Sequence, residues 1–123
     1  MENSTRTETI ERTQRPWGWF ETISEMPGNK IKRIGVLPCQ QISLQKHRHR
    51  SEHWVVVRGC AQVTLGDRVF DLTVGQHCDI ALDQVHRIAN RSADQLVEIV
   101  EVQFGDYLGE DDIIRLSDDY GRV

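Results

Sequence analysis

The sequence contains no apolar run close to the roughly 18 residues that a membrane-spanning helix requires. Its first residues include the charged side chains of Glu2, Arg6 and Glu8, so they lack the apolar core of an export signal. We therefore expect a soluble, cytoplasmic protein with no membrane partner. A chain of 123 residues has room for one domain with a single core, and not for two.

Cysteine is scarce, and positive charge is not in excess. Cys39, Cys60 and Cys78 are odd in number, scattered along the chain and free of any Cys-x-x-Cys pair. A disulfide framework is therefore not expected, and the three thiols are interpreted as small reduced hydrophobes. The net charge of −4 argues against nucleic acid as a partner, because such binding requires a net basic surface.

Helical periodicity is missing until Gly109–Asp119, where a short terminal helix or a loop is expected. Residues 1–14 are polar and aperiodic, which predicts a disordered lead-in before a domain over residues 15–123. Within that domain, Gly66-Asp67 has the composition of a two-residue hairpin turn. Short β-type segments are expected at Trp19–Ile23, Lys30–Leu37, Gln41–His47, Glu52–Arg58, Cys60–Leu65, Arg68–Leu72, His77–Leu82, His86–Asn90 and Gln95–Val102. Strands in this number without crossover helices indicate an all-β fold, an antiparallel sandwich or barrel.

Four of the five histidines fall within residues 47–53 and 86–90, both in β-type sequence. Alternate positions on a strand face the same way, so His47 and His49 are expected to converge. Glu52 or His53 would supply a third ligand and His86 a fourth, giving a site for a divalent first-row ion. Only one of these two neighbouring strand residues can point inward, and we prefer Glu52. The competing interpretation is that these histidines are solvated turn residues.

These residues resemble the two motifs of the cupin superfamily, which implies a double-stranded β-helix, the antiparallel jelly-roll barrel. The first motif joins His-x-His to a Glu placed seven positions before a Gly, as Glu52 and Gly59 are here. The second motif is reproduced in its spacing, although alanine and aspartate replace its usual proline and glycine. Its positions in this chain are Gly75, Ala81, Asp83, His86 and Asn90.

A closer resemblance runs from Arg15 to Arg122 and is to the C-terminal isomerase domain of type II mannose-6-phosphate isomerases. In those bifunctional proteins a guanylyltransferase domain precedes the cupin, and here we expect a stand-alone isomerase domain. The segments that carry the resemblance are Arg15–Gly18, Lys32–Ile34, Gln45–Gly59, Ile99–Gln103 and Tyr107–Ile113.

The resemblance implies interconversion of mannose 6-phosphate and fructose 6-phosphate on a bound divalent metal, expected to be zinc. Such a reaction moves a proton between C1 and C2, so it requires a Lewis acid on the sugar oxygens and a nearby base. Glu101 is the first candidate for the base, followed by Glu98 and by whichever of Glu52 and His53 is not a ligand. The solvent face of a strand is the competing location for each of these carboxylates.

The phosphate requires cations, and Arg50 is the first choice because its guanidinium can grip phosphate oxygens in pairs. Further substrate-binding candidates are Lys32, Arg33, Arg87, Arg115 and, from the segment shared with the family, Gln103. Trp17, Trp19 and Trp54 would either line a sugar-binding wall or fill the core.

Two other functions would use the same motifs, because a fold and a metal site do not determine a reaction. One is a non-catalytic cupin that binds a sugar phosphate or sugar nucleotide. The other is an iron-dependent oxygenation. The exposed edge strands of such a fold further suggest a homodimer.

Overall fold

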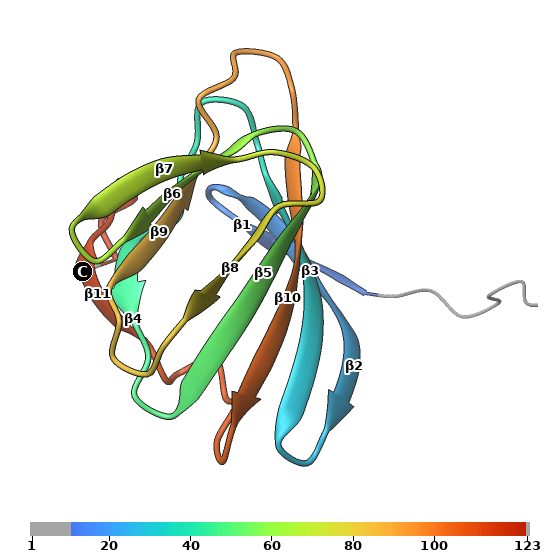
Figure 1. Cartoon of the computed structure of the whole chain (residues 1–123), viewed down its shortest axis with the longest axis vertical. Helices are drawn as coiled ribbons and strands as arrows, with labels where there is room; N and C mark the ends of the chain where they lie inside the picture. Colours follow the sequence, from blue (N-terminus) through green and yellow to red (C-terminus); the bar gives the residue numbers. More distant parts are fainter. Residues whose placement is uncertain (1–10, 123) are drawn as a thin grey trace, which may run out of the picture.

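The computed structural model describes residues 11–122, which form two antiparallel β-sheets packed face to face (Figure 1). The six-stranded sheet has the order β1-β2-β3-β10-β5-β8, and the five-stranded sheet has the order β11-β4-β9-β6-β7. The strands are β1 (Arg12–Arg15), β2 (Gly18–Met26), β3 (Asn29–Val36), β4 (Leu44–Lys46), β5 (Arg50–Arg58), β6 (Ala61–Leu65), β7 (Arg68–Leu72), β8 (His77–Ile80), β9 (His86–Ala89), β10 (Val97–Gly105) and β11 (Ile114–Ser117). Within residues 11–122 no helix is long and apolar enough to cross a membrane. The predicted all-β antiparallel architecture is confirmed.

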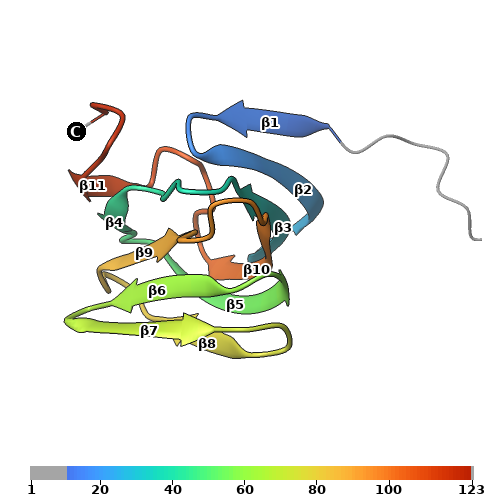
Figure 2. The same ribbon diagram turned by 90° about the horizontal axis from the view of Figure 1, so that it is seen from above.

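The two sheets enclose a single interior, which is seen end-on in Figure 2. Burial alternates strictly along the inner parts of β5 and β10, because successive strand residues face opposite sides of a sheet. The apolar part of the interior is built from fully buried branched side chains of both sheets: Val36, Val56, Val63, Ile88, Val97 and Ile99. Burial of these side chains is the main stabilising contribution to the fold.

The inward-facing side chains of the six-stranded sheet change from apolar to polar along its central strands. On β10, the inward-facing residues after Ile99 are Glu101 and Gln103, which are nearly or fully buried. Strand pairing places Glu101 between Lys32 of β3 and Trp54 of β5. Two residues further along β10, strand pairing places the inward-facing Gln103 between Lys30 of β3 and Glu52 of β5. One end of the barrel is therefore lined by charged and amide groups that the fold has removed from water.

Two predictions about the ends of the domain are wrong. Arg12–Arg15, expected to lie mostly in a disordered lead-in, pairs with Gly18–Glu21 as an edge strand. The expectation for residues 1–10 lies outside the described residues. Ile114–Ser117 lies in the segment expected to be a helix or loop, yet it pairs with β4. Both are edge strands of only four residues, too short for periodicity alone to identify, and the partner of Ile114–Ser117 is distant in the sequence.

Turn chemistry follows the sequence at two positions. The Gly66-Asp67 hairpin is confirmed by the pairing of Leu65 with Arg68, and Gly66 has a φ of 63°, as a tight two-residue turn requires. Asp83 stands where the second motif usually has glycine, and its φ of 60° is in the left-handed region that glycine favours. The motif's backbone conformation therefore survives the substitution.

The proposed homodimer would use the sheet edges, formed by β1, β8, β11 and β7, and stays a prediction.

Candidate metal centre and substrate cavity

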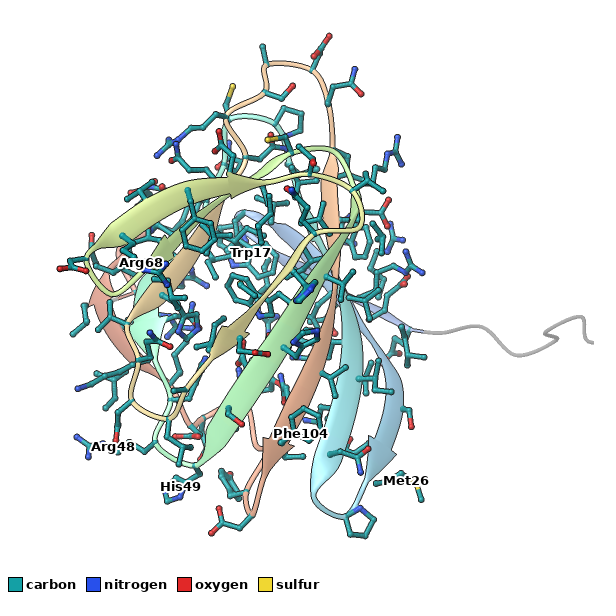
Figure 3. The ribbon with its side chains drawn as sticks, in the orientation of Figure 1. Trp17, Met26, Arg48, His49, Arg68 and Phe104 are labelled. Carbon is teal, nitrogen blue, oxygen red and sulfur yellow. The ribbon has the colours of Figure 1, made fainter. Side chains whose placement is uncertain are left out.

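A cavity of about 110 Å³ lies between the sheets at the polar end of the barrel. Its apolar wall includes Trp17 and Trp54, whereas Trp19 packs over Gly35 in the six-stranded sheet. Figure 3 shows Trp17 in the space between the sheets. The polar and charged lining residues are Arg15, Lys32, Ser43, Gln45, Arg50, Glu52, His86, Glu101, Glu110, Arg115 and Arg122.

His47, Glu52 and His86 form a buried cluster at this end of the barrel, and we call it the inner cluster. Their ligand atoms lie within 4.8 Å of one another. His47 Nε2 is 3.2 Å from Glu52 Oε2, and His86 Nε2 is 4.0 Å from Glu52 Oε1. Ligand atoms that share a tetrahedral zinc ion are separated by roughly 3.4 Å. The inner cluster therefore has the residue types and the spacing that could hold a divalent metal ion.

Backbone carbonyls fix both histidines in the tautomer that metal binding requires. His47 Nδ1 lies 2.6 Å from the carbonyl oxygen of Asp112, and His86 Nδ1 lies 2.9 Å from that of Gln84. A carbonyl only accepts, so each Nδ1 must carry the proton, and each neutral ring presents an unprotonated Nε2 to Glu52. Burial lowers the pKa of His47 to about 4, with the charge of Arg50 as a further cause, and burial lowers the pKa of His86 to about 4. Both rings are therefore neutral ligands at neutral pH.

The structure does not bring His49 to the inner cluster. Strand β4 ends at Lys46, so the alternation that predicted a common face for His47 and His49 does not extend to them. The His49 side chain is 54% exposed and lies 3.8 Å from Asp106. Figure 3 shows His49 at the lower edge of the molecule, just before the start of β5. Its predicted role as a metal ligand is not supported by this geometry.

Asp112 explains this local conformation, although no local sequence pattern identifies Asp112 in this role. Its carboxylate accepts hydrogen bonds from the backbone N–H groups of Arg48, at 3.0 Å, and His49, at 2.9 Å. Burial opposes ionisation, yet these hydrogen bonds hold the pKa of Asp112 below its usual range. With its carbonyl on His47, Asp112 holds the whole bend between β4 and β5.

Glu52 and His53 lie on opposite faces of β5. Glu52 is 3% exposed and points into the cavity. His53 points outward, 2.5 Å from Asp79 of β8, with its ring beside that of His77. The preference for Glu52 over His53 as the inward residue agrees with this arrangement. The candidate catalytic role of His53 does not, because its side chain is outside the cavity.

Glu101 lies beside the inner cluster, as expected of the candidate base. Trp54 Nε1 donates to Glu52 Oε1 at 2.9 Å and to Glu101 Oε2 at 3.1 Å, so one indole connects the two carboxyl groups. Gln103 Nε2 donates to Glu101 Oε1 at 2.7 Å. Complete burial, and then the neighbouring Glu52, raise the pKa of Glu101 to about 7. Glu98, the next candidate, pairs with Arg33 and Arg58 on the outer face.

Arg50 lies deeper than expected. A phosphate-binding side chain would be expected near the open end of the pocket, but Arg50 is only 6% exposed and its Nε donates to Glu52 Oε2 at 2.7 Å. Its Nη2 is 3.2 Å from His47 Nε2. The reason is strand alternation, which places Arg50 on the same inner face as Glu52. Arg50 therefore contacts the atoms expected to bind the metal.

The remaining candidate cations divide between the cavity and the surface. Lys32 lines the cavity and pairs with Glu110 at 2.7 Å. Arg115 lines it too. Arg87 does not, because its side chain donates to the backbone carbonyls of Ile42 and Ser117. Sequence reasoning missed five polar lining residues: Arg15, Ser43, Gln45, Glu110 and Arg122. Arg15, Gln45 and Glu110 lie in segments shared with the family, which could have drawn attention to them.

A comparison with known families identifies the family of this chain. Residues 2–118 match the family model described as "Mannose-6-phosphate isomerase C-terminal". The chain belongs to this family.

Curated relatives support the same assignment, and each is much longer than this chain. The alginate biosynthesis protein AlgA of Pseudomonas aeruginosa is 50% identical over 109 residues, which cover 89% of this chain and 22% of that protein. The xanthan biosynthesis protein XanB of Xanthomonas campestris is 49% identical over 112 residues, covering 91% and 24%. A mannose-1-phosphate guanylyltransferase of Klebsiella pneumoniae is 44% identical, covering 88% and 23%. The chain thus spans about a quarter of the length of these relatives.

Solved structures confirm the fold. An oxalate decarboxylase from Bacillus subtilis superposes with a TM-score of 0.76 at 17% identity, over 87% of this chain and 30% of that one. A double-stranded β-helix protein from Klebsiella pneumoniae gives a TM-score of 0.68 at 22% identity, over 89% and 88%. The predicted cupin-type double-stranded β-helix is therefore confirmed. The identity of the metal, expected to be zinc, stays a prediction.

Proposed function

We propose that this domain is a metal-dependent aldose–ketose isomerase that interconverts mannose 6-phosphate and fructose 6-phosphate. The observation that carries the proposal is the position of Glu101, a buried carboxyl group beside the inner cluster and inside the same cavity. The isomerisation needs a base next to a group that polarises the sugar oxygens. Membership of the isomerase family supports the same reaction class.

His47, Glu52 and His86 would hold the ion, and zinc is the ion we propose. When bound, it would supply a Lewis acid for the oxygens on C1 and C2 of the open-chain sugar. Both imidazoles already present Nε2 toward Glu52, so the residues fit the ion without a change of tautomer. Asp112 and Gln84 keep this orientation through their carbonyls.

Glu101 would move the proton. Its carboxylate would remove the proton from C2 of the aldose, so that the C2–H electron pair forms the C1–C2 double bond while the C1 carbonyl π pair moves onto O1. A proton then passes from O2 to O1, the protonated carboxyl group returns its proton to C1, and the electron pair left on O2 forms the C2 carbonyl of the ketose. Trp54 and Gln103 hold the carboxyl group in place through donated hydrogen bonds. With a pKa raised to about 7, Glu101 exists in both protonation states near neutral pH, as a group that accepts and then donates must.

Exchange of the C2 proton of mannose 6-phosphate with deuterated water tests the proposal on the zinc-loaded chain. We expect exchange by the wild type and a loss of about 100- to 10,000-fold in Glu101→Gln, with unchanged zinc content. Glu98→Gln is the matched control, because it alters the same strand on the outer face. No exchange by zinc-loaded wild type, or undiminished exchange by Glu101→Gln, would contradict the proposal.

A non-catalytic binding module is the second candidate function. It is favoured by the state of Glu52, whose two carboxylate oxygens already accept hydrogen bonds from Arg50 and Trp54. A carboxylate held in this way can serve as part of a structural network without any ion. Binding of mannose 6-phosphate in the absence of zinc uptake and of proton exchange would identify the domain as such a module.

A further inference from the structure

Three arginines from the two ends of the domain line the cavity together. Arg15 ends the first edge strand, Arg115 lies on β11, and Arg122 follows at the C-terminal end. We call Arg15, Arg115 and Arg122 the arginine group. Arg15 is exposed and the other two are half-buried, whereas His86 and Glu101 are buried. The arginine group therefore lies on the solvent side of the cavity, and the inner cluster lies at its depth.

The positive charge of the arginine group is only partly neutralised. Arg122 is paired with Asp118 through two parallel contacts of 2.8 Å. Arg15 donates to the backbone carbonyl of Gln14. Arg115 makes no side-chain hydrogen bond among residues 11–122, and its buried Nε has no partner there. An unpaired buried donor is costly, so a donor of this kind indicates a place for an acceptor that the chain itself does not supply.

Electrostatics agrees with this geometry. Burial lowers the pKa of Arg115, and the charges of Arg122 and Arg15 lower it further, while Asp118 alone opposes them. Five cationic side chains line the cavity against three carboxyl groups, and Glu110 is already paired with Lys32. An anion between the arginines would relieve this repulsion.

Strand register gives the distance between the arginine group and the inner cluster. Arg115 of β11 pairs with Gln45 of β4, and Gln45 pairs with His86 of β9. The three residues thus lie side by side on one inner face across adjacent strands. Two strand spacings amount to about 10 Å, which suits an open-chain hexose with its carbonyl end at the cluster and its far end at Arg115.

We infer that the arginine group, with Arg115 at its centre, binds the phosphate of a phosphorylated sugar whose other end lies at the inner cluster. This inference rests on the proposed function, because it places the 6-phosphate of the same substrate. A guanidinium offers paired donors that match phosphate oxygens, and Nε of Arg115 is one of the donors without a partner. Arg50, the choice made from the sequence, is already held by Glu52 at the deep end.

The test is calorimetric binding of mannose 6-phosphate and of mannose to the zinc-supplemented full chain. We expect wild type to prefer the phosphorylated sugar at least about tenfold. Arg115→Gln should lose about ten- to a hundredfold in affinity for mannose 6-phosphate and leave mannose unchanged. Arg115→Lys should recover part of the loss, because lysine keeps the positive charge but lacks the paired donors of the guanidinium group. Arg33→Gln is the matched control, since Arg33 pairs with Glu98 on the outer face, and it should bind as wild type does.

Two results would overturn the inference: no preference for the phosphorylated sugar in wild type, or an unchanged preference in Arg115→Gln. If Arg115→Gln does not fold, as judged by its thermal transition, Arg115→Lys decides, and equal binding by Arg115→Lys and wild type overturns it. The proposed function fails separately. Phosphate-dependent binding that is lost in Arg115→Gln, without proton exchange at C2 in wild type, supports the inference and contradicts the isomerase.

Discussion

Strand β5 carries two histidine–carboxylate groups on its opposite faces, and they differ in almost every physical respect except composition. Inside the barrel, Glu52 joins His47 and His86 in the inner cluster, where each side chain is at most 2% exposed. Outside, His53 pairs with Asp79 of β8 and lies beside His77. We call these three the outer group. Here Asp79 is 84% exposed and His53 is 33% exposed.

From this difference we predict that burial and fixed tautomers, rather than ligand-type side chains alone, determine which group binds a metal ion. In the inner cluster both imidazoles are held by carbonyls and directed at one carboxylate. In the outer group His53 uses Nδ1 on an exposed carboxylate, where water competes for both partners. We therefore expect the inner cluster to bind zinc and the outer group to contribute little to binding or stability.

The largest effect is expected from removing an inner imidazole. His86→Ala should lower zinc affinity by more than about a hundredfold. Loss of a group that only orients a ligand typically costs about 10- to 100-fold in metal affinity, and loss of the ligand itself should cost more. His77→Ala, the same change in the outer group, should leave the affinity unchanged. Competition with a chromophoric chelator measures both. Equal affinities in the two variants would remove the distinction between the faces.

Acid should destabilise the zinc-free protein through the inner histidines. Their folded pKa of about 4 lies below the ordinary 6.5, so as pH falls from 6.5 the unfolded chain gains protons that the folded chain does not, and stability is lost. Glu101 acts in the opposite direction, because its pKa is raised from the ordinary 4.5 to about 7 in the folded protein. Above pH 4.5 the unfolded chain releases this proton more readily than the folded chain does, so the contribution of Glu101 to stability falls as the pH rises and returns as the pH falls.

The net loss between pH 6.5 and pH 4.5 should be about 2 kcal/mol, and about 4 kcal/mol in Glu101→Gln, where the opposing contribution is absent. Urea unfolding of chelator-treated protein at the two pH values measures it. A free energy of unfolding that rises as pH falls would show that the inner histidines are not buried in the neutral form.

A smaller effect is expected at Asp112, which holds the bend that carries His47. Asp112→Ala removes the acceptor of two backbone N–H groups but keeps the carbonyl on His47, so zinc affinity should fall about tenfold. Asp111→Ala is the matched control, because Asp111 is exposed and hydrogen-bonds Tyr107 instead. If both variants bind zinc as wild type does, the bend does not depend on the Asp112 carboxylate.

The smallest effect should come from the outer ion pair. Asp79→Asn removes the charge facing His53 and should change the free energy of unfolding by less than about 0.5 kcal/mol, because the carboxylate is largely exposed. Thermal unfolding of the variant measures this. A loss of several kcal/mol would mean that the outer group is a structural element in its own right.

Sequence reasoning succeeded where long strands keep a strict alternation. The spacing of Glu52 to Gly59 indicated that Glu52 faces inward, and β5 keeps that alternation without interruption. Glu101 was expected to face inward if the last long strand turned it so, and β10 does. The same rule, applied one step further, would have placed Arg50 inside the barrel.

It failed where a side chain's position depends on distant residues. His49 lies in a bend shaped by Asp112, more than sixty positions away in the sequence. Arg115 reaches the cavity only because β11 pairs with β4, and no local sequence pattern predicts this pairing. These positions are set by long-range pairing and capping rather than by periodicity.

We expect the inner face of β5 to carry the metal centre, and the neighbouring residues Glu52 and His53 offer the sharpest comparison of the two faces. Zinc binding should be measured on Glu52→Gln and His53→Gln in the same preparation, with thermal unfolding to confirm that both fold. Glu52→Gln should lose zinc, and His53→Gln should bind close to one ion per chain with wild-type affinity. Loss of zinc in His53→Gln, with binding kept in Glu52→Gln, would contradict the account.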